Sequence, residues 1–129
     1  MDILEIQALD AGYNSKAVLQ DINLVVSAGQ FVSVVAPNGA GKSTFLKTIA
    51  GVLPLVKGSI CLYGKVLSSY ERRELAKQIA VVSSDVPSID YTALQIVLMG
   101  RFPHLSRFSG PSSVDHAIIQ EAMEEVGIW

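Results

Sequence analysis

Residues 36–44 read Ala-Pro-Asn-Gly-Ala-Gly-Lys-Ser-Thr, and this run constrains the fold more than any other feature of the chain. It matches the phosphate-loop pattern G-x-x-x-x-G-K-[ST] at Gly41, Lys42 and Ser43, while Ala36 stands where the pattern has glycine. The apolar, β-branched residues 30–35 before it predict a buried strand. Residues 43–50 after it predict a helix that stops at Gly51. Strand, glycine loop and helix in this order form the context in which such a run holds phosphate.

The predicted chemistry of this run follows from the strong hydration of a polyphosphate, because a protein must offer many donors at once to compete with water. A bend free of Cβ atoms lets successive backbone N–H groups converge, and the following helix adds the positive end of its dipole. Lys42 is expected to reach the β- and γ-phosphates, and the Ser43 hydroxyl to bind Mg²⁺. The predicted nucleotide ligands in the run are Asn38, Gly39, Ala40, Gly41, Lys42, Ser43 and Thr44.

Ala36 leaves two possibilities open. If position 36 requires a positive φ, alanine is strained there by about 1–2 kcal/mol. If the position requires only a small side chain, alanine is harmless.

The composition bounds the remaining possibilities. The chain has 129 residues, is half hydrophobic and carries a net charge of −2, which suits one domain with a core and provides no basic stripe for nucleic acid. We expect neither a signal peptide nor a membrane-spanning segment. The single cysteine, Cys61, is interpreted as a buried thiol. His104 has no partners at ligand spacing, so no metal centre is predicted around it.

Further along the chain, strands alternate with helices. Strands are predicted over residues 3–9, 17–26, 59–63 and 79–82, and a surface helix over 70–78. A loop is predicted over residues 83–90, and Thr92 with Gln95 forms a capping-box spacing that opens a helix through Met99. Ser112 opens a last helix. This order predicts an α/β fold with antiparallel strands at its front and a helical insertion beginning near its end.

Several runs are similar to the nucleotide-binding domain of ABC transporters. They are Leu-Gln-Asp-Ile-Asn-Leu from residue 19, the phosphate loop itself, Ile-Ala-Gly-Val-Leu from residue 49, Leu-Tyr-Gly from 62 and Glu-Leu-Ala-Lys-Gln-Ile-Ala from 74. The resemblance implies a partial P-loop NTPase core that binds ATP and Mg²⁺. It implies a RecA-like and antiparallel β portion over residues 1–90 and the start of a helical subdomain over 91–129. Tyr13 occupies the place of the aromatic residue that stacks on adenine in this family.

Residues 100–108 resemble, more narrowly, the ATPases that power uptake of iron–siderophore complexes, haem and cobalamin. This resemblance implies an ATPase subunit that dimerises and contacts membrane permease subunits on the inner face of the cell membrane.

The sequence also departs from the family pattern. The glutamine expected after residues 79–82 falls near Ser84, which is too short for the same reach, and Asp85 is a nearby oxygen donor. No Walker B run, signature motif or switch histidine is found. We therefore expect ATP binding without hydrolysis by these residues, either as the N-terminal portion of an importer ATPase or as a degenerate or truncated nucleotide-binding module. A P-loop kinase or GTPase is disfavoured, and no Asn-Lys-x-Asp motif of a GTPase is present.

Overall fold

The computed structural model describes residues 1–84, 88 and 90–129. It divides into two compact units, residues 1–75 and residues 76–129. The predicted boundary between residues 90 and 91 stays a prediction. In the order of the chain, the first unit contains β1 (Asp2–Tyr13), β2 (Lys16–Ser27), α1 (Lys42–Ile49), β3 (Lys57–Leu62), β4 (Lys65–Val66) and η1 (Leu67–Ser69). The helix α2 (Arg72–Gln78) crosses the division, and α3 (Ala93–Met99), η2 (Phe102–His104) and α4 (Ser113–Glu125) follow.

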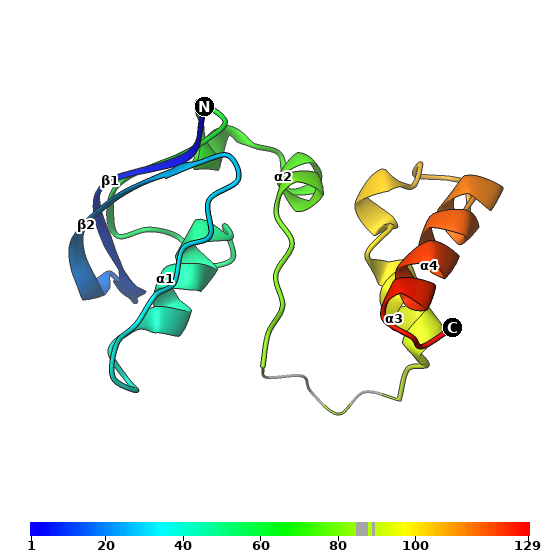
Figure 1. The fold of residues 1–129 in the computed structure, drawn as a ribbon. Helices are drawn as coiled ribbons and strands as arrows, with labels where there is room; N and C mark the ends of the chain where they lie inside the picture. The colour runs from blue at the N-terminus through cyan, green and yellow to red at the C-terminus, as the bar shows by residue number, and fades with distance from the viewer. Residues whose placement is uncertain (85–87, 89) are drawn as a thin grey trace. The chain divides into compact units, whose positions relative to one another are not determined.

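The sheet of the first unit has the order β2-β1-β3-β4, and all of its described strand pairs are antiparallel. The antiparallel piece predicted at the front of the chain is thereby confirmed, with β1 and β2 longer than the sequence pattern indicated. The turn between them is short because Asn14 and Ser15 both adopt positive φ, 50° and 60°, which matches the twist of a tight hairpin. Figure 1 shows β1 and β2 curving side by side.

The core of the first unit lies between this sheet and α1. Ile6 and Leu9 of β1, Ile60 of β3 and Phe45 of α1 are buried, as is Leu67 of η1. The buried residues of α1 are Thr44, Phe45 and Thr48, so one side of this helix faces the protein interior. Gly51 ends the helix as predicted: its φ is 73°, and its N–H donates to the Thr48 carbonyl at 3.1 Å.

Two predicted strands are wrong. Residues 30–35 and residues 79–82 have no regular secondary structure, and Figure 1 draws the connection between β2 and α1 as coil. Phe31 is 93% exposed, Val35 92% and Val82 99%. A buried strand needs backbone partners beside it and apolar cover on its faces, and among the described residues no strand pairs with either segment.

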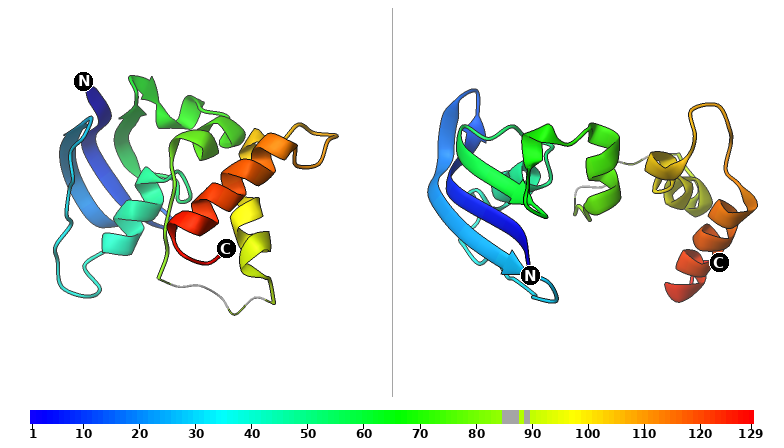
Figure 2. Two further views of the ribbon diagram at one scale, coloured as in Figure 1. Left: turned by 45° about the vertical axis from the view of Figure 1, so that its right-hand side comes forward. Right: turned by 90° about the horizontal axis from the view of Figure 1, so that it is seen from above.

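The second unit is helical in its regular parts. α3 packs against α4, and Figure 2 shows the two helices next to each other. The predicted capping box of Thr92 and Gln95 is present at the start of α3. Ser112 opens α4 as predicted, and it forms a second capping box with Asp115. In the loop predicted over residues 83–90, Asp85 and Pro87 lie outside the described residues. None of the helices formed by the described residues combines the length and apolar character needed to cross a bilayer.

Candidate functional site

The glycine-rich run forms a left-handed bend directly before α1. Gly39 has a φ of 82° and Gly41 a φ of 101°, while Ala40 between them is not among the described residues with positive φ. Backbone conformations that alternate in this way are typical of a nest, in which N–H groups converge on one side of the chain.

The N-terminus of α1 adds backbone donors next to this bend. Gly41 is the N-cap of the helix, and no side chain caps it. The first intrahelical bond runs from the Phe45 N–H to the Gly41 carbonyl at 2.9 Å. By helix geometry, the N–H groups of residues 42–44 lie ahead of the first intrahelical bond and are available to an anion. The Ala40 N–H is engaged within the bend, where it donates to the Pro37 carbonyl at 3.2 Å.

Lys42 folds back over the bend. Its ammonium donates to the Ala36 carbonyl at 2.5 Å and to the Pro37 carbonyl at 3.0 Å. The cation is therefore held at the mouth of the loop by the two residues that lead into it. Ala36 is not among the described residues with positive φ, so the strained alternative is excluded and a small side chain is all that the position requires.

The bend and Tyr13 share one pocket of about 370 Å³. Tyr13 ends β1 immediately before the hairpin turn, and 46% of its surface is exposed. Val18 of β2 lies in the same pocket. The residues that line it are Tyr13, Val18, Asn38, Gly39, Gly41, Lys42, Ser43 and Thr44. The sheet hairpin and the phosphate loop, which are distant in the sequence, thus meet at one cavity.

Among the predicted ligands, only Ala40 does not line this pocket; together with residues 32–36 and Lys42, it lines another, mostly apolar pocket. Ser43 is exposed, whereas Thr44 is buried. Val18 is a lining residue that the sequence pattern did not single out. Lys16 pairs with Tyr13 across the hairpin turn, and Val18 follows two residues later in β2; this closeness in the sequence was the signal that could have indicated it.

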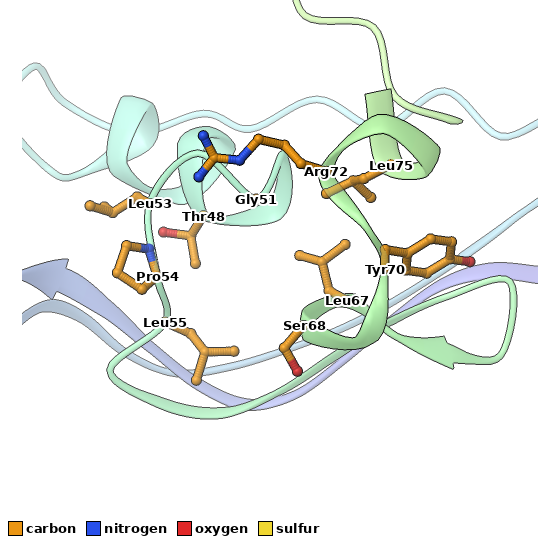
Figure 3. Close-up of a pocket in the computed structure, with 10 residues that line it drawn as sticks. All are labelled: Thr48, Gly51, Leu53, Pro54, Leu55, Leu67, Ser68, Tyr70, Arg72 and Leu75. Atoms are coloured by element: carbon orange, nitrogen blue, oxygen red, sulfur yellow. The ribbon is translucent and has the colours of Figure 1, made fainter. Parts of the chain in front are cut away.

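A second pocket of about 330 Å³ lies at the other end of α1 (Figure 3). Its walls are mostly apolar, with Leu53, Leu67 and Leu75 among the residues that line it. Two of its hydroxyl groups are already engaged: Thr48 donates to the Thr44 carbonyl at 2.8 Å and Tyr70 to the Leu62 carbonyl at 2.8 Å. This pocket therefore offers apolar surface rather than a converging set of reactive groups.

In the second unit, one ion pair ties η2 to α4. Arg101 contacts the Asp115 carboxylate at 2.8 Å. The side chain and backbone N–H of Ser112 donate to the same carboxylate, and together with Arg101 they lower the pKa of Asp115 to about 2. His104 lies in η2, and the described residues contain no cluster of three or more His, Cys, Asp or Glu side chains able to hold a metal ion.

The comparisons with known proteins agree with this geometry. The family model for ABC transporters matches residues 19–129. The iron(3+)-hydroxamate import ATP-binding protein of Bacillus subtilis is 33% identical over 130 residues, covering 99% of this chain and 48% of that protein. The hemin import ATP-binding protein of Methylobacillus flagellatus is 35% identical, covering 97% of this chain and 46% of that protein.

Among solved structures, an ATP-binding cassette of an ABC transporter superposes with a TM-score of 0.77 at 21% identity, covering 99% of this chain and 55% of that one. This likeness supports the fold, a partial α/β P-loop NTPase core. The chain belongs to the ABC transporter family of ATP-binding proteins. It spans between 29% and 49% of the length of the curated relatives it matches.

Proposed function

We propose that this chain forms the nucleotide-binding part of the ATPase subunit of an ABC importer. The observation that carries the proposal is the shared pocket, in which an aromatic ring, a nest of backbone N–H groups and a lysine ammonium face one cavity. An adenine nucleotide has the matching groups, a flat base at one end and a polyphosphate at the other.

The phosphate end of the pocket fits the proposed ligand. Open space lies beside Gly39, where an added Cβ would find no atom within 4 Å. The β- and γ-phosphates would lie over the bend, with the N–H groups of Gly39 and of residues 41–44 as donors and Lys42 balancing their charge. The exposed Ser43 hydroxyl would supply a protein oxygen to Mg²⁺, and phosphate oxygens and water would complete the octahedron.

The base end depends on Tyr13. A tyrosine ring offers a large flat surface with few rotatable bonds, so stacking costs little side-chain entropy. Since half of its surface remains exposed beside the phosphate loop, the ring is available to a base.

A titration with a fluorescent ATP analogue and Mg²⁺ tests the site. Saturable binding by the native chain and a loss of at least tenfold in affinity for Lys42→Ala are expected, because the lysine is the only protein side chain predicted to carry positive charge to the phosphates. Equal affinity in the two proteins would refute the proposed site. The Lys57→Ala variant is the matched charge control, because Lys57 in β3 is exposed and does not line the pocket.

We further propose ATP binding without hydrolysis by these 129 residues, because the groups expected to activate water are not found in their sequence. The expectation of binding without hydrolysis is the same whether the chain is the N-terminal portion of an importer ATPase or a degenerate nucleotide-binding module. Phosphate release from Mg-ATP by the purified chain, at a rate above that of the Lys42→Ala variant, would contradict it.

The proposed cargo is an iron–siderophore or related metal chelate, and the proposed partners are membrane permease subunits and a second ATPase subunit at the inner face of the membrane. The names of the relatives support this class, since they include importers of ferric hydroxamate and hemin. Uptake of labelled ferric hydroxamate by cells that carry either the native gene or a Lys42→Ala allele tests it. Equal uptake by both would contradict the proposal.

A further inference from the structure

The two carbonyl groups that hold Lys42 belong to a segment with little support from regular structure. Residues 30–37 form no strand, so no sheet ladder fixes the direction of the Ala36 carbonyl. The Pro37 carbonyl also accepts from the Ala40 N–H, at 3.2 Å. Yet the Lys42 ammonium finds both of them, at 2.5 Å for Ala36 and 3.0 Å for Pro37. An ammonium has three donors, so this arrangement leaves one for a ligand.

Two features of the local sequence restrict the backbone conformation of residue 36. Ala36 precedes a proline, which disfavours the helical region for it and pushes it toward extended conformations. Its methyl group also removes the positive-φ conformations that glycine would populate freely. Position 36 is therefore confined to the extended region, and its negative φ in the structure agrees with this restriction.

We propose that Ala36, at the position where the phosphate-loop pattern has glycine, is a positioning residue that keeps its own carbonyl directed at Lys42 and so holds the ammonium at the mouth of the loop. This rests on the proposed nucleotide site. The gain is entropic, because a glycine at position 36 has more backbone conformations to lose when this segment takes its ordered conformation.

The test measures the affinity for a fluorescent ATP analogue with Mg²⁺ in two variants. Ala36→Gly removes the Cβ, and Ala36→Ser keeps it. Ala36→Gly is expected to bind about two- to fivefold more weakly than the native chain, and Ala36→Ser to bind as the native chain does. Pro37→Ala relaxes the same restriction by another route and should also weaken binding. Ala28→Gly is the matched control: it removes a methyl group from the turn after β2, where the Ala28 N–H donates to the Met1 carbonyl.

A double-mutant cycle separates positioning from a general effect on folding. In a Lys42→Ala background there is no ammonium for the carbonyl to hold, so Ala36→Gly should no longer change the affinity for the ATP analogue. Native affinity for both Ala36→Gly and Pro37→Ala, or an undiminished effect of Ala36→Gly without Lys42, would overturn the inference. Failure of the native chain to bind, or binding by Lys42→Ala as tight as by the native chain, would instead refute the nucleotide site itself.

Discussion

Replacing either of the two left-handed glycines of the phosphate loop by alanine should be costly, and the structure predicts which replacement costs more. Gly39 has a φ of 82° and Gly41 a φ of 101°. A Cβ on Gly39 would meet nothing within 4 Å. A Cβ on Gly41 would lie 3.0 Å from the Leu19 Cγ and 3.1 Å from the Val18 Cγ1.

The expected free-energy cost of each substitution follows from the backbone conformation of the glycine and from the space available to an added Cβ. An alanine in the left-handed region costs about 1–2 kcal/mol, and both variants incur this cost. At position 41 the neighbouring side chains must also move aside, which adds about 1 kcal/mol, at the low end for overpacking. We therefore expect about 1–2 kcal/mol for Gly39→Ala and about 2–3 kcal/mol for Gly41→Ala.

The assay must measure both the free energy of unfolding and the affinity for the nucleotide, because the cost of each substitution can fall on either. If the loop keeps its shape, the variant loses stability; if the loop relaxes, the variant loses affinity for the nucleotide. Urea unfolding followed by circular dichroism gives the free energy of unfolding, and titration with a fluorescent ATP analogue gives the dissociation constant. The sum of the two losses is the quantity predicted. A sum for Gly41→Ala equal to or below that for Gly39→Ala would refute the reasoning.

Three further predictions concern single side chains. Tyr13→Ala should weaken ATP binding by about 1 kcal/mol, roughly fivefold, through lost stacking, while affinity for inorganic triphosphate in a competition assay stays unchanged; equal losses for both ligands would exclude stacking. Ser112→Ala should destabilise the cap of α4 by about 1 kcal/mol, measured by urea unfolding, whereas Ser113→Ala, one residue inside the helix, should be nearly neutral. The pKa of Asp115 is lowered to about 2 from 3.8, so the stabilising effect of its carboxylate is complete above about pH 4 and is lost as the pH falls toward 2. The difference in free energy of unfolding between the native chain and Asp115→Asn should therefore shrink over that pH range. A constant difference would contradict the role of the carboxylate.

Local features of the fold could be predicted from the sequence because their causes are local. Thr92 and Ser112 begin helices by bonding to residues three positions further on, and this spacing is visible in the sequence. The stop at Gly51 and the left-handed bend around Gly41 follow from the same kind of short-range rule.

The errors arose where the structure depends on distant partners. Residues 30–35 have the composition of a buried strand, but composition cannot supply the neighbouring strands that would pair with them. The same applies to residues 79–82. The ends of β1 and β2 were underestimated for the opposite reason, because each strand supplies the other with a partner up to the turn at Asn14.

The candidate site was predicted in its residues but not in its geometry. The pattern identified the phosphate loop, and the resemblance added Tyr13. Neither could show that Val18 joins them in one pocket or that the Ala36 carbonyl binds Lys42. Those contacts depend on how the β1–β2 hairpin lies against the start of α1, which is a property of the folded unit.

The central claim is that the backbone N–H groups of Gly39 and of residues 41–44 bind the polyphosphate of a nucleotide. Amide chemical shifts in an ¹⁵N-labelled sample, followed while Mg-ATP is added, test it most directly. We predict large, saturable shifts for Gly39, Gly41 and Ser43 with Mg-ATP and much smaller ones with adenosine, which lacks the phosphates. Saturable binding of Mg-ATP that leaves these amides unmoved would contradict the claim.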